Sequence, residues 1–158
     1  MFGSEKSPFA VAIKAAADEA RQRGDRRIGT EHLLLGLLRT PDSITSRALG
    51  VDLATARRAL ADLDAAALRA IGLDIDPPPP TRPRRHPPVS PTALATGART
   101  ALTQAVKTTT RKNRDTEGPA QLLLALLSHE PPDPVAQLLD HLGIDRPTTR
   151  TRLTHSAE

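Results

Sequence analysis

The sequence contains no cysteine, no tryptophan and no tyrosine, and it has only two phenylalanines. Without cysteine the chain can form neither a disulfide nor a thiolate metal site. Aromatic residues are enriched in β-strands, so an aromatic fraction of 1% argues against a β-sandwich or a barrel. The same scarcity removes the stacking platform with which proteins hold single-stranded nucleic acid.

Long apolar runs are also missing. The N-terminus lacks the apolar stretch of a signal peptide, and no run of about 18 apolar residues occurs. We therefore expect a soluble, cytoplasmic protein that does not enter a membrane. The 158 residues suffice for one compact domain or for two small halves that share a core.

The most informative segment spans residues 28–38, where a helix start leads into a leucine-rich run. Thr30 is predicted to cap this helix, because its hydroxyl can accept a bond from a free helical N–H group. Glu31 lies in the first turn, where the helix dipole favours an anion. The five leucines that follow are interrupted only by Gly36, which predicts a helix buried nearly all round.

A second copy of this segment lies 89 positions later, at residues 117–127. It keeps the leucines, but Pro119, Ala120 and Gln121 stand where the first copy has Thr, Glu and His. The Leu-Gly-Val-Asp sequence at residues 49–52 likewise returns as Leu-Gly-Ile-Asp at residues 142–145. Two landmarks in the same order predict an internal duplication, and hence an all-α protein built from two four-helix repeats.

The expected organisation is a first repeat over residues 1–73, a linker over 74–91 and a second repeat over 92–158. The linker is rich in proline and arginine, which predicts an extended polyproline segment between the halves. Helix starts, periodicity and glycine stops place the helices at about 7–24, 30–39, 43–49, 52–71, 96–110, 119–128 and 133–142, with one more to follow.

These residues resemble the N-terminal domain of the Clp family of AAA+ unfoldases, the ClpA and ClpC group. The family signature I-G-T-E-H-[IL]-L-L-G-L is present at residues 28–37, and the Met1-Phe2 start also matches. The resemblance covers essentially the whole chain and implies a pseudo-twofold pair of four-helix repeats. No G-x-x-x-x-G-K-[ST] loop occurs, so the ATPase modules are missing and the chain is expected to be a separate N-domain or an excised fragment.

The resemblance implies a site for phosphorylated arginine, a degradation tag, in which Glu31 engages the guanidinium while helix-start amides and the Thr30 hydroxyl hold the phosphate. Pro119 and Ala120 cannot supply these groups, so at most one such site is expected. The competing interpretation is that Glu31 only stabilises its own helix through the dipole.

The resemblance also implies a second surface, which accepts cyclic-peptide antibiotics and adaptor or substrate peptides. By position, Phe2, Ile13 and His86 match it, while Val89 replaces the aromatic residue that follows the linker histidine in the family. Ordinary core packing for Ile13 and an exposed linker position for His86 are the alternatives.

No residues point to catalysis, to a metal or to a cofactor. Adjacent helical residues diverge, so Glu31 and His32 do not converge on one ion, and His32 is interpreted as a structural histidine. We expect a non-catalytic peptide- or degron-binding module of the Clp protease system, acting as an adaptor or decoy. The alternative is a regulatory protein that binds nucleic acid or another polyanion through two basic clusters, at residues 82–85 and 111–114.

Overall fold

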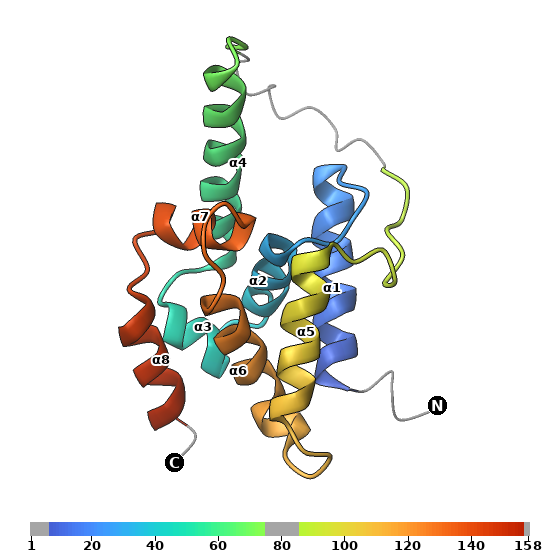
Figure 1. Ribbon diagram of the computed structural model, residues 1–158, viewed down its shortest axis with the longest axis vertical. Coiled ribbons are helices and arrows are strands. Elements are labelled where there is room, and N and C mark those ends of the chain that lie inside the picture. The colour runs from blue at the N-terminus through green and yellow to red at the C-terminus, as the bar shows by residue number, and fades with distance from the viewer. Residues whose placement is uncertain (1–6, 75–85, 157–158) are drawn as a thin grey trace.

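The computed structural model describes residues 7–74 and 86–156, and these residues form eight helices and no extended strand (Figure 1). The helices of the first half are α1 (Pro8–Arg23), α2 (Thr30–Leu38), α3 (Ile44–Leu49) and α4 (Leu53–Ala70). Those of the second half are α5 (Thr96–Thr108), α6 (Arg114–Leu127), α7 (Pro134–His141) and α8 (Arg146–His155). The prediction of an all-α protein is confirmed.

The two sets of four helices interlock. In each half the first helix packs along the second, so that α1 lies against α2 and α5 lies against α6. The third and fourth helices instead pack across the halves, α3 on α8 and α4 on α7. The helices α2 and α6 meet in the middle, and leucines of both, including Leu34 and Leu123, are fully buried in one hydrophobic cluster. The leucine runs of the two copies therefore form a single shared core.

Several helices begin and end at the capping residues that the sequence predicts. The side chains of Ser7, Ser43 and Asp52 accept hydrogen bonds from first-turn N–H groups of α1, α3 and α4. Gly24 and Gly50 follow α1 and α3 with φ values of 79° and 70°. Glycine adopts this left-handed conformation without a steric penalty, which explains the stop after each helix.

The start of α6 differs from the prediction. The sequence predicts a start at Pro119, but the helix begins at Arg114, and Pro119 lies inside it. Asn113 accounts for the extra turn, because its carbonyl accepts the Glu117 N–H at 2.8 Å and its Nδ2 donates to the Glu117 carboxylate at 2.7 Å. These two bonds close a helical turn ahead of the proline, which itself lacks an N–H group.

Ion pairs to a buried acid fix α1 against the end of α2 and against α4. Glu19 is 1% exposed and accepts hydrogen bonds from Arg39 at 2.8 Å and from Arg57 at 2.6 Å. Burial raises the pKa of the Glu19 carboxyl, but the bonds from Arg57 and Arg39 outweigh it, and the net pKa lies below its ordinary value.

A short backbone contact ties the start of the second half to the segment before α2. Ile28 donates its N–H to the Ala93 carbonyl at 2.8 Å and accepts the Ala95 N–H at 2.9 Å, forming an isolated parallel bridge with Leu94. The bridge brings the start of α5 beside the start of α2. This placement creates the site described next.

Candidate functional site

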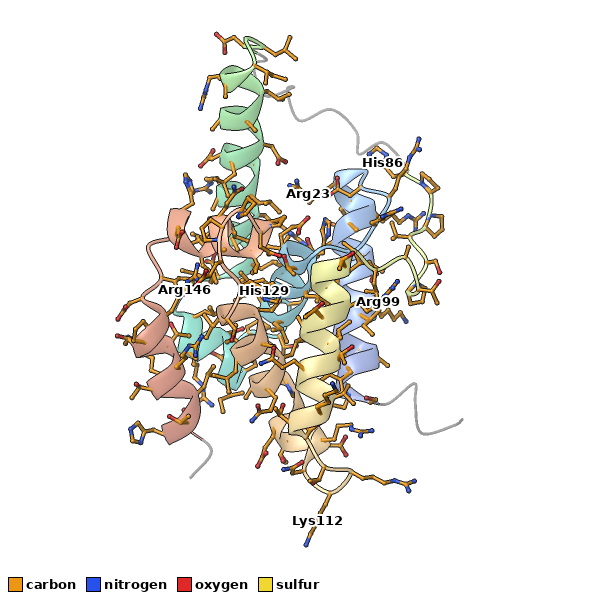
Figure 2. All side chains as sticks on the ribbon, in the orientation of Figure 1. Arg23, His86, Arg99, Lys112, His129 and Arg146 are labelled. Atoms are coloured by element: carbon orange, nitrogen blue, oxygen red, sulfur yellow. The ribbon has the colours of Figure 1, made fainter. Side chains whose placement is uncertain are left out.

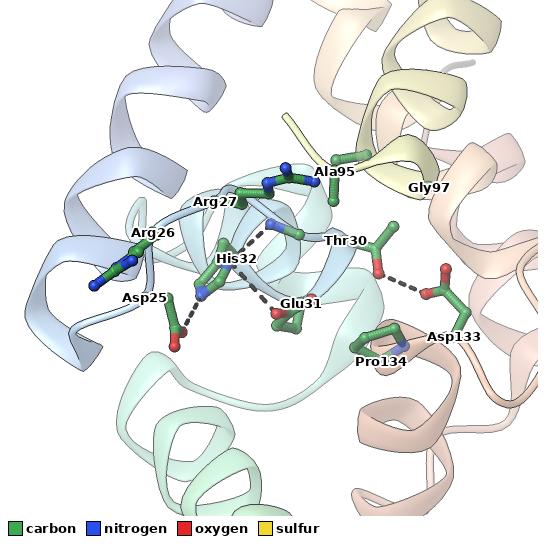
Figure 3. A pocket seen from close by; sticks show the side chains of 12 residues that line it. Asp25, Arg26, Arg27, Thr30, Glu31, His32, Ala95, Gly97, Asp133 and Pro134 are labelled. Atoms are coloured by element: carbon green, nitrogen blue, oxygen red, sulfur yellow. Dashed lines mark hydrogen bonds and ion pairs between the residues drawn. The ribbon is translucent and has the colours of Figure 1, made fainter. Parts of the chain in front are cut away.

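A pocket of about 440 Å³ opens at the N-terminus of α2, where three parts of the chain meet (Figure 3). Its lining comes from the connection between α1 and α2, from the start of α5 and from the start of α7. Arg26, Arg27 and Glu31 line one side, and Gly97 and Asp133 line the other. We call this the Glu31 pocket.

Glu31 contributes a carboxylate with a free acceptor atom. Its side chain is 15% exposed, and its Oε2 atom is shielded from solvent without a hydrogen-bond partner among the described residues. The carboxylate folds back over Gly29, where an added Cβ atom would overlap it. A buried carboxylate oxygen without a donor is unfavourable, so a cationic ligand that supplies donors would gain from binding here.

His32 lies beside this carboxylate and is 1% exposed. Its Nδ1 is 2.8 Å from the Gly29 nitrogen, and its Nε2 is 2.7 Å from Asp25 Oδ2. A backbone N–H can only donate, so Nδ1 is the unprotonated nitrogen and Nε2 carries the proton given to Asp25. The expectation of a satisfied structural histidine fits this geometry.

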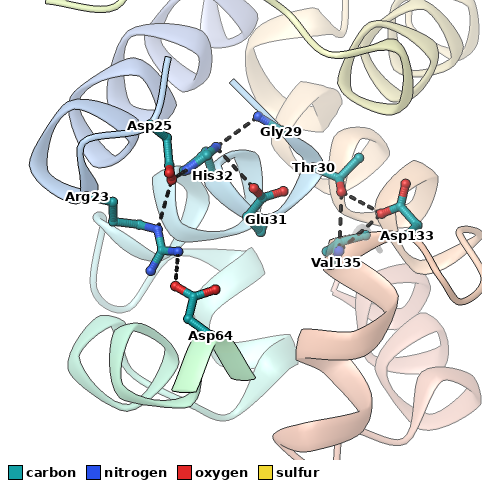
Figure 4. A network of polar contacts seen from close by, with 9 residues as sticks. All are labelled: Arg23, Asp25, Gly29, Thr30, Glu31, His32, Asp64, Asp133 and Val135. Atoms are coloured by element: carbon teal, nitrogen blue, oxygen red, sulfur yellow. Dashed lines mark hydrogen bonds and ion pairs between the residues drawn. The ribbon is translucent and has the colours of Figure 1, made fainter. Parts of the chain in front are cut away.

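Asp25 extends the polar network toward α4 (Figure 4). The hydrogen bond from His32 lowers the pKa of the Asp25 carboxyl, burial acts in the opposite direction, and Arg23 adds to the lowering. Arg23 bonds Asp25 at 3.0 Å and Asp64 of α4 at 2.5 Å. Asp25, which lines the Glu31 pocket, is thereby joined through Arg23 to both α1 and α4.

Thr30 does not cap its own helix, which corrects the prediction from the sequence. It is the first residue of α2, and Gly29 occupies the cap position. The Thr30 hydroxyl instead donates to Asp133 at 2.5 Å and accepts the Val135 N–H at 3.2 Å, across to the start of α7. The hydroxyl is therefore engaged in holding the two halves together.

Because Gly29 rather than Thr30 occupies the cap position, the start of α2 is open to the pocket. Gly29 offers no side-chain cap, so the first-turn N–H groups and the positive end of the helix dipole have no anionic cap from that position. Arg26 and Arg27 are exposed, and neither forms an ion pair within the described ranges. The pocket thus places a free carboxylate next to groups that attract an anion.

The pocket is completed by two residues whose part in it could not be predicted from the sequence. In the sequence, Gly97 and Asp133 stand only at the starts of the helices predicted at about 96–110 and 133–142. A Cβ atom at Gly97 would lie 2.8 Å from Asp133 Oδ2, so the glycine leaves room for that carboxylate. The available signal is the duplication, which makes α5 and α7 of the second half the counterparts of α1 and α3 of the first.

A related pocket of about 360 Å³ lies at the corresponding position of the other half. Its lining comes from the first part of α1, the end of α2 and the starts of α3 and α6, and includes Pro8, Ser43, Asp115 and Pro119. Ala120, which stands where the first copy has its glutamate, is buried and carries no charge. The two copies share the hollow, but only the first has a carboxylate at the Glu31 position; in the second copy Asp115 brings a carboxylate from a different position in the first turn of α6.

The second predicted surface is only partly assembled. Ile13 is half-buried and lines a groove of about 690 Å³ between α1 and the segment that carries Val89 and Pro91. His86 lies elsewhere: its ring packs over Gly24, and its carbonyl accepts a 2.8 Å bond from Arg21. It is half-buried rather than exposed. Phe2 lies outside the described residues.

One of the two basic clusters predicted from the sequence, at residues 111–114, lies within the described residues. Lys112 lies on a loop at the end of the molecule opposite His86 (Figure 2). Arg82, Arg84 and Arg85 lie outside the described residues. Across residues 7–74 and 86–156, no group of three or more histidines and acids could hold a metal ion. The helices in these ranges include none that is long and apolar enough to cross a bilayer.

The family model described as the Clp repeat (R) N-terminal domain matches residues 7–82. This range covers α1 to α4 and contains the residues of the Glu31 pocket that come from the first half. No curated protein matches the chain.

Proposed function

From the premise that residues 7–82 form a Clp repeat N-terminal domain, we propose that this chain is a non-catalytic module that binds peptides of the Clp degradation system. Clp repeat domains are protein-interaction modules, which supports the general class. The ligand, and a role as an adaptor or as a decoy that competes with a complete Clp unfoldase, are the parts proposed here.

The Glu31 pocket is the proposed site for an arginine side chain that bears a phosphate. The observation that carries the proposal is the shielded Glu31 Oε2 atom, which has no donor among the described residues. A guanidinium group supplies several N–H donors in a fork that suits a carboxylate. The uncapped start of α2, with Arg26 and Arg27 beside it, suits the phosphate.

The proposed site differs in one respect from the one implied by the resemblance. The Thr30 hydroxyl is engaged by Asp133 and Val135, so phosphate recognition rests on backbone N–H groups and the two arginines. Asp133 also brings a second carboxylate to the opposite wall. We therefore expect the guanidinium to contribute more to affinity than the phosphate does.

The groove beside Ile13 is the proposed second surface for peptides, including cyclic-peptide antibiotics. Its lining combines apolar side chains with Lys14 and Asp18, which offer one charge of each sign. A peptide with an apolar side chain and polar backbone groups fits such a groove.

Titration with free phosphoarginine, followed by calorimetry, tests the proposal. The wild-type chain should bind it, and Glu31→Gln should weaken binding by about tenfold or more, because the amide removes the charge but keeps the shape. Asp115→Asn, in the related pocket of the other half, is the matched control and should leave the affinity unchanged. Phosphoserine should not compete.

Short duplex DNA and a cyclic peptide that binds ClpC form the other arms of this experiment. The cyclic peptide should bind, and Ile13→Ala should weaken it without affecting phosphoarginine. Binding of DNA alone, with a steep salt dependence, would instead favour the polyanion-binding class. Equal phosphoarginine affinity of the wild type and Glu31→Gln would overturn the assigned site.

A further inference from the structure

We propose that His32 is a positioning residue that leaves the Glu31 carboxylate free for a guanidinium ligand only while its imidazole ring is neutral, so that acidification closes the pocket. The inference rests on the proposed function of the same pocket, because it concerns the regulation of ligand binding there. It is carried by the geometry of one buried ring and the groups around it.

The ring has one nitrogen facing two different partners. His32 Nδ1 lies 2.8 Å from the Gly29 nitrogen and 3.5 Å from Glu31 Oε1. While Nδ1 is unprotonated, it accepts the Gly29 N–H and offers nothing to the carboxylate. Glu31 then has no donor from His32, and its charge remains available to a ligand.

Protonation of the ring reverses this arrangement. A proton on Nδ1 would face the Gly29 N–H, and two donors cannot share a hydrogen bond. The new N–H of Nδ1 would find its acceptor in Glu31 Oε1, already 3.5 Å away. The pair would then neutralise the carboxylate that a guanidinium needs, and the start of α2 would lose its anchor on the ring.

Charged groups from several elements surround the ring. Asp25, in the connection between α1 and α2, accepts from Nε2, and Arg23 of α1 pairs with Asp25. Asp64 of α4 pairs in turn with Arg23. Glu31 of α2 faces Nδ1 of the ring at 3.5 Å. The imidazole is the group in this network whose charge ordinarily changes between about pH 5 and pH 8.

The second copy of the helix start supports a link between the Glu31 carboxylate, which binds the ligand, and the His32 ring, which controls it. Ala120 replaces the glutamate there, and Gln121 replaces the histidine. Where the carboxylate is absent, the titrating ring is absent as well. Gln121 is half-buried on α6, which shows that the fold accepts an uncharged amide at the corresponding position.

The first test needs no ligand. In ¹⁵N spectra of the imidazole groups, His32 should carry its proton on Nε2 at about pH 8, and acidification should shift the Gly29 amide signal together with the ring signals. Glu31→Gln removes the proposed partner of the protonated ring, so the midpoint of the His32 titration should move to lower pH. A proton on Nδ1 at about pH 8, or an unchanged midpoint, would overturn the inference.

The second test measures binding of N-acetyl-L-arginine amide, whose guanidinium does not titrate in this range. The wild-type affinity should fall by about threefold or more between about pH 8 and pH 5.5. His32→Asn keeps an acceptor for Gly29 without a titrating group and should bind equally at both values. His32→Gln, which introduces the amide found in the second copy, repeats the test should the first variant fold poorly. His141→Asn, at a half-exposed histidine on α7, is the matched control and should keep the wild-type pH dependence.

The outcomes separate the two proposals. Wild-type binding that is equal at both pH values would refute the role of His32 and leave the Glu31 pocket intact. Absence of N-acetyl-L-arginine amide binding at about pH 8 would refute recognition of the guanidinium by Glu31, and the spectra would still decide whether His32 and Glu31 are coupled. A loss of pH dependence in His32→Asn, with affinity kept at the higher pH, would support the inference.

Discussion

The Thr30 hydroxyl donates a 2.5 Å hydrogen bond to the carboxylate of Asp133, which lies 103 positions further along the chain. The same hydroxyl accepts the Val135 N–H, so it takes part in capping a helix that belongs to the other half. The contact forms one edge of the Glu31 pocket (Figure 4). The pocket therefore lies at the junction of the halves rather than within one repeat.

Thr30→Val tests whether this hydroxyl serves the fold or the ligand. The side chain is 2% exposed, and its loss would deprive Asp133 of a donor, so the free energy of unfolding should fall by about 1–2 kcal/mol in urea denaturation. Affinity for phosphoarginine should stay within about twofold. Thr100→Val, where the hydroxyl bonds an exposed turn of its own helix, is the control and should change stability little. A large loss of affinity in a stable Thr30→Val protein would mean that the hydroxyl contacts the ligand.

Gly29→Ala should damage the pocket without damaging the fold. The φ angle of Gly29 is −94°, which alanine adopts freely, but the new Cβ would occupy the place of the Glu31 carboxylate. Phosphoarginine affinity should therefore fall to the level of Glu31→Gln, while stability changes by about 1 kcal/mol or less. Gly118→Ala, at the same position of the second copy, should leave phosphoarginine binding intact. Retention of wild-type affinity in Gly29→Ala would show that the observed carboxylate position is unimportant.

The fold could be predicted largely because its signals are local. Capping by Ser7, Ser43 and Asp52, and the glycine stops after α1 and α3, depend on neighbouring residues only. Two local signals compete at the start of α6. Pro119 is a strong local signal for a helix start, but the contacts between Asn113 and Glu117 override it.

The candidate site could be predicted only in part, because it depends on contacts between distant residues. Glu31 is recognisable from its place at a helix start. Asp133 and Gly97 enter the pocket through the interlocking of the halves, for which no single segment carries a signal. The engagement of Thr30 is hidden from the sequence for the same reason, since both of its partners lie in the second half.

Gly36→Ala should destabilise the protein through the contact between α1 and α2. A Cβ atom there would lie 3.0 Å from the Ala16 nitrogen and 3.1 Å from the Ala12 carbonyl, and backbone atoms cannot yield as a flexible side chain can. The free energy of unfolding should fall by about 1–3 kcal/mol, measured by urea denaturation. Gly143→Ala would be a poor control because its φ is 68°. Leu124→Ala in α6, at a half-buried position, gives a better comparison for a simple loss of apolar area.

Glu19 should make the stability of the protein depend on pH in the acid range. Its pKa is lowered in the folded state, so its contribution is complete above the ordinary value of 4.5 and is lost as the pH falls through the lower folded-state value. Glu19→Gln removes the charge that Arg39 and Arg57 share, and it should reduce the free energy of unfolding at neutral pH by about 1–3 kcal/mol. The variant should then lose less stability than the wild type on further acidification. Urea denaturation at a series of pH values measures both effects, with the exposed Glu130→Gln as control. Parallel stability curves for the wild type and Glu19→Gln would show that the carboxylate is not ionised differently in the two states.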